Sequence, residues 1–241
     1  MRYFTRPQKN IAITRNVAIA EARGRFLFFI DDDEIAAPRW MQRLIDCQRT
    51  FAADAVFGRI IPHFPEESPD WVRSTFLFNR HCQATGTPSR RTCSANCLVR
   101  ADLLAALDVP FDERYGLTGG EDTQMFARLA ARGARFVDCY EAEVTEFQPP
   151  ERTTWEWLRN RAVRTGSLQT RRQVEMADRA GVAALRGFCC GTAYAGYCLT
   201  MSLATLRNTS QSLNWRLRAL YGFGQVRGVF RRPLDGYCSA A

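Results

Sequence analysis

The order of apolar and polar residues predicts short strands separated by amphipathic helices over the first two-thirds of the chain. Phe26–Ile30 is an unbroken apolar run, which is typical of a strand buried on both faces inside a parallel sheet. Ala55–Ile61 and Ala134–Tyr140 are further short runs of this kind. Strands that alternate with helices favour the α/β class, with a mostly parallel sheet flanked by helices.

Four helices are predicted in the same region from their caps and their apolar spacing. Thr14 supplies a cap for the first helix, Pro38 is a favourable first-turn residue for the second, and a Thr-Thr-Trp-Glu capping box precedes the last. Apolar residues recur at helical spacing behind these starts, and glycines supply the expected stops. The predicted helices span residues 14–23, 38–51, 121–133 and 153–166.

The last part of the chain has a different pattern. Gly187–Leu206 is twenty residues without a charge, which is long enough to span a bilayer, although Gly, Ser and Thr dilute its apolar character. Arg is interleaved with aromatic and aliphatic residues in Trp215–Arg232, a mixture that suits an anionic membrane surface. A helical pair packed on the protein is the alternative. We therefore predict two domains, residues 1–166 and a basic helical tail of residues 167–241.

Composition narrows the function classes. A chain of 241 residues with 46% apolar residues is typical of a globular protein. With only His63 and His81, a histidine-centred metal site is poorly supported, and the nine Cys lack Cys-x-x-Cys spacing and are expected to be reduced thiols of a cytoplasmic protein. The net charge of +8 belongs to the tail, because residues 1–178 carry 25 basic and 24 acidic groups. Nucleic-acid binding is not predicted.

The acidic run Asp31–Glu34 is the first candidate for chemistry, because it follows directly on the predicted strand Phe26–Ile30. Parallel sheets bind ligands beyond the carboxyl ends of their strands. Four adjacent carboxylates favour a divalent cation, and oxygen ligands suit Mg²⁺ or Mn²⁺, which commonly bridge to substrate phosphates. The alternative is a solvated acidic turn before the next helix.

The run Gly119-Gly120-Glu121-Asp122 is the second candidate. Two glycines let the backbone approach a ligand closely, and acids in the first turn of a helix are favoured by its dipole. An ionised Asp in such a turn can accept a hydroxyl proton as a general base. Simple capping of the helix is the alternative reading.

Both candidates belong to motifs that resemble the GT-A-fold family 2 glycosyltransferases. Phe-Ile-Asp-Asp-Asp-Glu resembles the family's metal-binding segment, and Phe111–Asp122 resembles its acceptor-site motif "FDe.fg..ggeD". Arg15-Asn16 resembles a signature that lies near the nucleotide in that family, and Asn96 occupies the position of a residue near the donor sugar. The resemblance covers roughly residues 1–166 and implies a nucleotide-diphosphate-sugar donor.

The resemblance also implies residue roles. Asp31 and Asp33 would hold Mn²⁺ or Mg²⁺, and Glu146 stands where many relatives carry a His as a further metal ligand. Asp122 would act as the base, positioned by Glu121. The residues expected to bind substrate are Asp31, Asp32, Arg15, Asn16, Asn96, Gly119 and Gly120.

The expected function is metal-dependent transfer of a sugar to an acceptor hydroxyl of a surface polysaccharide or lipid-linked glycan, at the cytoplasmic face of the cell membrane. The β-α-β unit that normally opens the family's domain has no counterpart before residue 1, so we expect an N-terminally incomplete GT-A-like fold. That absence leaves an alternative, a truncated and non-catalytic remnant that serves as a binding or scaffold module.

Overall fold

The computed structural model describes residues 3–4 and 7–230 and divides the chain into two compact units. The first unit comprises Met1–His63 and Arg80–Phe147, and the second comprises Phe64–Asn79 and Gln148–Ala241. The end of the predicted basic tail, residues 231–241, lies outside the described residues.

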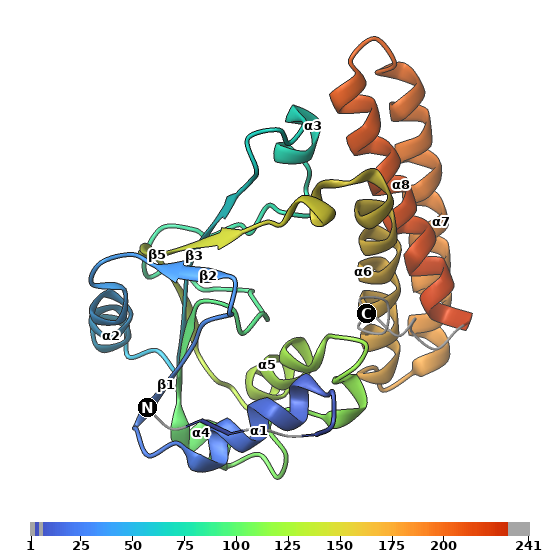
Figure 1. Cartoon of the computed structure of the whole chain (residues 1–241). Helices are drawn as coiled ribbons and strands as arrows, with labels where there is room; N and C mark the ends of the chain where they lie inside the picture. The colour runs from blue at the N-terminus through green and yellow to red at the C-terminus, as the bar shows by residue number, and fades with distance from the viewer. Residues whose placement is uncertain (1–2, 5–6, 231–241) are drawn as a thin grey trace. The chain divides into compact units, whose positions relative to one another are not determined.

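The first unit is built on a five-stranded mixed sheet in the order β1-β4-β3-β5-β2 (Figure 1). Only β3 and β5 are parallel; the pairs β1–β4, β3–β4 and β2–β5 are antiparallel. The strands are β1 (Phe26–Phe29), β2 (Glu34–Ala36), β3 (Ala55–His63), β4 (Cys97–Arg100) and β5 (Phe136–Phe147). The predicted α/β class is therefore confirmed, whereas the prediction of a mostly parallel sheet is wrong.

Helices cover both faces of this sheet, which explains why the pattern of β1 misled. Leu27 and Phe29 pack against a core cluster that includes Phe126 of α5, and Phe26 and Phe28 pack against a second cluster that includes Leu44 of α2. A strand covered on both faces reads as a continuous apolar run in either pairing direction. The helices of this unit are α1 (Ile11–Glu21), α2 (Trp40–Phe51), α4 (Ala101–Ala105) and α5 (Glu121–Ala131).

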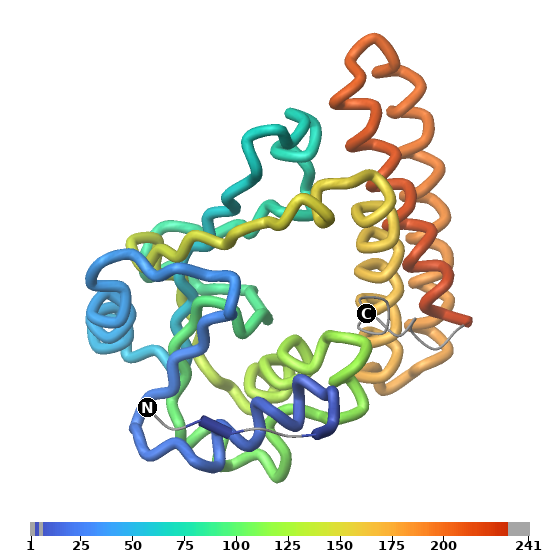
Figure 2. The backbone as a smooth tube through the Cα atoms, in the orientation of Figure 1, coloured from blue at the N-terminus to red at the C-terminus, as the bar shows by residue number. Residues whose placement is uncertain are grey.

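The N-terminal helix begins earlier than its sequence suggested. Asn10, not Thr14, is the cap, because its side-chain oxygen accepts hydrogen bonds from the backbone N–H groups of Ala12 and Ile13 at 3.0 and 3.2 Å. Helix α1 lies beside the segment that leads into α5, although about a hundred residues separate them in the sequence (Figure 2). This pairing of distant segments forms the candidate site.

The second unit is helical. The long helices α6 (Trp155–Glu175), α7 (Ala180–Ala204) and α8 (Thr209–Phe230) pack together, and the short helix α3 (Asp70–Arg73) contributes to the same core. The expected domain boundary after residue 166 falls inside α6. Gly166 does not end that helix, which continues to Glu175. Its missing side chain instead lets the backbone of α8 approach, since an added Cβ would lie 2.1 Å from the Tyr221 carbonyl oxygen.

Small residues also line the face of α7 that packs inward, where Gly187, Gly191, Cys198 and Ser202 are buried. Several larger apolar side chains of α7 face outward, including Leu185, Leu199 and Leu203. Among the described residues, no helix combines the length and the hydropathy needed to cross a bilayer.

Candidate active site

Asp122 sits in the first turn of α5, and the two preceding glycines set its position. Gly119 and Gly120 have φ angles of 80° and 97°, which lie in the left-handed region that glycine adopts without strain. The carboxylate of Asp122 accepts a hydrogen bond from the backbone N–H of Ser94 at 3.2 Å and another from the backbone N–H of Thr123 at 2.6 Å. The predicted arrangement of a glycine turn, a helix start and an oriented carboxylate is therefore present.

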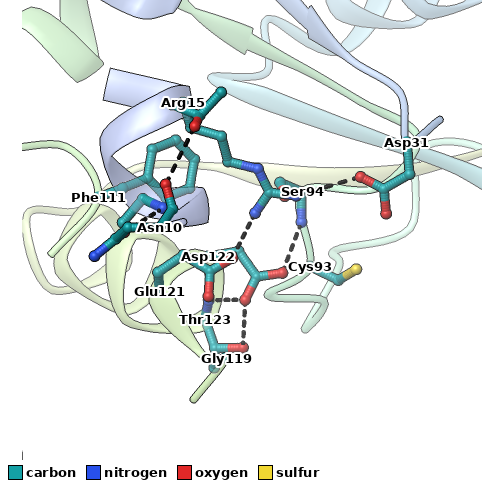
Figure 3. Close-up of polar contacts among 12 residues, drawn as sticks. Asn10, Arg15, Asp31, Cys93, Ser94, Phe111, Gly119, Glu121, Asp122 and Thr123 are labelled. Atoms are coloured by element: carbon teal, nitrogen blue, oxygen red, sulfur yellow. Dashed lines mark hydrogen bonds and ion pairs between the residues drawn. The ribbon is translucent and has the colours of Figure 1, made fainter. Parts of the chain in front are cut away.

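Arg15 connects this turn to the acidic run after β1 (Figure 3). Its Nη1 donates to Glu121 Oε1 at 2.6 Å, and its Nη2 donates to Asp31 Oδ1 at 3.3 Å. The guanidinium also lies over the Phe111 ring, 5.4 Å from the ring centroid. The two predicted site motifs lie about ninety residues apart in the sequence, and the guanidinium of Arg15 forms an ion pair with a carboxylate of each.

Glu121 is buried, with 4% of its surface exposed. Burial is the largest cause that raises its pKa, to about 7, and the neighbouring charge of Asp122 raises it further, while Arg15 opposes both. The side-chain oxygen Oε2 is buried and has no hydrogen-bond partner among the described residues. The side chain that precedes the predicted base is therefore a buried acid that forms an ion pair with Arg15.

Asn16 serves the fold of the acceptor motif. Its side-chain oxygen accepts a hydrogen bond from the backbone N–H of Phe111 at 2.9 Å, and its amide nitrogen donates to the Phe111 carbonyl at 2.8 Å. Asn16 therefore fixes the start of the segment 111–122. The expected place of Arg15-Asn16 near the nucleotide stays a prediction.

Asn96 has a structural role in the first unit, and its expected place near the donor sugar stays a prediction. Its side chain is fully buried, with 0% exposed. It donates to the carbonyls of Arg59 and Ala142 at 2.7 and 2.9 Å and accepts from the Trp40 indole at 2.7 Å. These three partners occupy the amide, which ties β3, β5 and α2 together behind the sheet.

The side chains of the acidic run Asp31–Glu34 have different environments. Asp31 is partly buried, and desolvation is the main cause that raises its pKa, against the opposing charge of Arg15. Asp32 is exposed, whereas Glu34 is buried in β2. The loop is fixed at its end, because the Asp33 carbonyl accepts a hydrogen bond from the Phe147 backbone at 2.9 Å.

Glu34 and Arg80 belong to the site, and sequence reasoning missed both. Glu34 lies opposite Glu146 in the β2–β5 pair, and both are buried. Arg80 donates to Glu146 Oε1 at 3.2 Å. Burial raises the pKa of Glu34 to about 7, and the carboxylates of Asp31 and Glu146 add to the effect. The only available signal for Glu34 was its place in the acidic run; Arg80 lies in a segment without periodicity.

The donors near the end of β1 suit a hard cation in their chemistry. The candidate ligand atoms are carboxylate oxygens, which Mg²⁺ and Mn²⁺ prefer. In the part of the chain that the structure describes, Glu34 Oε1 and Glu146 Oε2 are buried and have no hydrogen-bond partner. The group is not preassembled: within the described part of the chain, no three His, Cys, Asp or Glu side chains converge as a metal-binding set. Asp31 and Glu146 are each paired with an arginine instead.

Comparison with known proteins assigns the family. Residues 1–107 match the family described as "Glycosyl transferase family 2". The succinoglycan biosynthesis protein ExoM of Rhizobium meliloti (strain 1021) is 30% identical over 227 residues, which cover 94% of this chain and 73% of that protein. The chain belongs to glycosyl transferase family 2. This membership confirms the resemblance that the motifs carried and makes the protein a transferase by family.

Solved structures of TarS from S. aureus are more distant. One TarS structure is 17% identical, with a TM-score of 0.42, and the match covers 84% of this chain but only 41% of that one. The complex of TarS 1-349 with UDP-GlcNAc is 16% identical, with a TM-score of 0.41 and coverage of 88% and 71%.

Proposed function

We propose that this chain transfers a sugar from a nucleotide-diphosphate sugar to a hydroxyl group of a glycan acceptor during polysaccharide synthesis. The observation that carries the proposal is the placement of Asp122 in an oriented helix turn that Arg15 links to Asp31. A base for an acceptor hydroxyl and an acidic site for a charged donor then lie on the two sides of one arginine. Family membership and the similarity to ExoM, a succinoglycan biosynthesis protein, support the same reaction.

In the proposed reaction, Asp122 takes the proton of the acceptor hydroxyl. The acceptor oxygen forms the new bond to the anomeric carbon of the donor sugar while the bond from that carbon to the diphosphate breaks. The nucleoside diphosphate leaves with the electron pair of that bond. The backbone N–H groups of Ser94 and Thr123 hold the carboxylate of Asp122 in one orientation for this transfer.

Asp31 and Asp33 are the residues that we expect to hold Mn²⁺ or Mg²⁺, with Glu146 as a further oxygen ligand. The fit rests on the oxygen-only donors and on Glu146 Oε2, which is buried and has no hydrogen-bond partner within residues 3–4 and 7–230. A cation bound there would stabilise the negative charge that develops on the diphosphate. Asp32, which is exposed beside these residues, is expected to face the substrate.

Two substitutions test the donor and acceptor roles separately. Asp33→Ala should abolish metal-dependent binding of a nucleotide sugar, measured by calorimetry with Mn²⁺ and a panel that includes UDP-GlcNAc. Asp122→Asn should keep that binding and lose transfer. Asp46→Asn, an exposed aspartate on α2, is the matched control and should change neither property. Unchanged turnover in Asp122→Asn removes it as the base.

The same panel decides against the non-catalytic alternative. If the folded wild-type protein binds no nucleotide sugar with either metal, the proposed transfer is wrong and a binding or scaffold module is favoured. Circular dichroism on the calorimetry sample establishes that the protein is folded.

The proposal extends to the cytoplasmic face of the membrane, where a lipid-linked or surface glycan would be met. Residues 179–235 carry eight Arg and one Asp, and α7 exposes Leu185, Leu199 and Leu203. Each basic residue close to an anionic surface contributes on the order of 1 kcal/mol. The wild-type chain should therefore sediment with phosphatidylglycerol vesicles and not with phosphatidylcholine vesicles. Salt at 1 M, about ten times ordinary ionic strength, should release it.

A double variant sharpens this test. Leu199→Asp with Leu203→Asp should weaken vesicle binding, because each substitution removes an exposed apolar side chain and adds a negative charge. Val109→Asp, an exposed apolar position of the first unit, serves as the control. A wild-type chain that stays in the supernatant with anionic vesicles at low salt contradicts membrane attachment.

A further inference from the structure

Arg15 is placed to make the two halves of the candidate site respond to each other. One guanidinium donates to Glu121 at 2.6 Å with Nη1 and to Asp31 at 3.3 Å with Nη2, and Figure 3 shows it between the two carboxylates. Its side chain is 17% exposed, and that of Glu121 is 5% exposed. Charge-assisted hydrogen bonds in such a partly buried place are stronger than those at an open surface.

The three anchors of Arg15 are unequal. The contact with Glu121 is the shorter and more buried one, and the Phe111 ring supports the guanidinium from one face. The contact with Asp31 is longer, and the side chain of Asp31 is 38% exposed. Asp31 is therefore the partner whose surroundings a ligand can change, while Glu121 lies inside the protein.

We propose that Arg15 is a positioning residue that couples occupation of the donor side, at Asp31, to the order of the turn that carries Asp122. This inference rests on the proposed function. A cation and diphosphate bound at Asp31 would share the negative charge of that carboxylate, so the bond from Arg15 to Asp31 weakens. The positive charge of Arg15 is then less divided, and its bond to Glu121 strengthens.

The consequence for α5 follows from adjacency in the chain. Glu121 immediately precedes Asp122, and both lie in the first turn of α5. A firmer hold on Glu121 restricts this turn and therefore the carboxylate of Asp122. The donor side would then order the base before the acceptor arrives, and linkage requires that ordering of the base favours donor binding to the same extent.

Amide hydrogen exchange tests this coupling without measuring turnover. The probes are UDP with Mn²⁺, and GDP, CDP, ADP and dTDP as alternatives if UDP does not bind. In the wild-type protein, the nucleotide and metal should slow exchange in residues 26–36 and also in residues 118–127, by about threefold or more in the second segment. The second segment belongs to the acceptor motif, so slowing there reports the coupling.

Arg15→Lys is the decisive variant, because it keeps the charge but removes the planar fork that serves two carboxylates at once. It should bind the nucleotide with a dissociation constant within about threefold of wild type and should still slow exchange in residues 26–36. Its residues 118–127 should no longer respond. Retention of the full response in that segment overturns the proposal.

Arg100→Lys is the matched control. Arg100 also bridges two carboxylates in the first unit, those of Asp54, at 2.8 Å, and of Asp102. Its replacement should leave the response of residues 118–127 intact. Loss of that response in Arg100→Lys means that general loosening of the unit, not Arg15, explains the result and overturns the proposal.

Two further outcomes separate this inference from the proposed function. A wild-type protein that binds no nucleotide of the panel overturns the proposed function, and this coupling with it. A wild-type protein that binds a nucleotide but shows no slowing in residues 118–127 overturns the coupling alone. If Arg15→Lys does not fold, Glu121→Gln replaces it: this variant keeps the shape but weakens the bond to Arg15, so a response as large as that of wild type contradicts the proposal.

Discussion

Gly119 and Gly120 of the first unit and Gly224 of the second unit serve different purposes. In the first unit, Gly119 and Gly120 adopt positive φ angles and turn the chain into α5, with no side chain close enough to be crowded at Gly119. In the second unit, Gly224 lies within a helix, and an added Cβ would lie 2.2 Å from the carbonyl oxygen of Val163. Gly119 and Gly120 aim a functional group, whereas Gly224 lets two helices come together.

Buried polar groups show the same division. The first unit buries Glu121, Glu34, Glu146 and Asn96, which need charged or hydrogen-bonding partners. The second unit buries mainly apolar and small side chains between its long helices. The first unit therefore buries charged groups near one another, whereas the second unit is held together mainly by close packing between helices.

The largest effect is expected from a substitution that removes the proposed base of the first unit and leaves the packing of that unit intact. Asp122→Asn keeps the shape and one oxygen of the side chain, so folding should be unaffected. Turnover should fall by about a hundred- to ten-thousand-fold, the usual contribution of a general base. Steady-state kinetics at saturating donor measure this, and a turnover number within a factor of about three of wild type would contradict the role of a general base.

The second prediction tests whether a buried polar group holds the sheet of the first unit together. Asn96→Ala removes the side-chain hydrogen bonds that the Trp40 indole and two carbonyls make inside the protein. The free energy of unfolding should fall by about 3 kcal/mol, measured by urea denaturation. Asn79→Ala, at an exposed position, should change it by less than about 0.5 kcal/mol.

The third prediction uses the buried acid of β2. The pKa of Glu34 is raised from 4.5 to about 7, mainly by burial. Between these values the folded state holds a proton that the unfolded chain releases, so the free energy of unfolding should fall as pH rises from 5 to 7.5. Glu34→Gln should reduce this dependence by on the order of 1–3 kcal/mol.

Urea denaturation in the presence of EDTA measures the dependence, because a bound cation would change the charge balance at the site. Glu67→Gln, an exposed position in the second unit, is the control and should retain the wild-type dependence. A Glu34→Gln protein with an unchanged slope against pH would show that Glu34 does not hold the proton.

The smallest effects compare two glycines of the helical unit. Gly224→Ala meets the backbone of Val163, so it should destabilise the protein by about 1–3 kcal/mol. Gly196→Ala has no atom within 4 Å of the added Cβ, so it should stabilise α7 by roughly 0.5–1 kcal/mol. Opposite shifts of the urea midpoint confirm the packing role, and equal shifts contradict it.

Sequence reasoning succeeded where the signal was local. The place of the acidic run just after a strand and the start of a helix at Glu121 could be predicted, because each follows from a pattern of a few adjacent residues. The roles of these acids stay predictions. The pairing directions of β1 and β4 could not, because helices cover both faces and remove the alternation that distinguishes an antiparallel strand.

Long-range partners were equally invisible. Nothing near Asn96 in the sequence indicates that its amide would serve Trp40 and two strands, and nothing near Arg80 indicates that it would pair with Glu146. Gly166 was expected to end a helix, since a glycine stop and a glycine packed against a neighbouring helix look the same in one sequence. These features depend on where distant segments meet.

The grip of the N-terminal helix on the acceptor motif has a consequence for recombining relatives. Asn10 donates to the Glu113 carbonyl at 3.0 Å, Asn16 holds the Phe111 backbone, and an added Cβ at Gly116 would overlap the Asn10 side chain. A crossover anywhere between residues 16 and 111 would join one parent's helix to the other parent's motif. Productive chimaeras should therefore inherit both segments from one parent, although the two segments lie far apart in the gene.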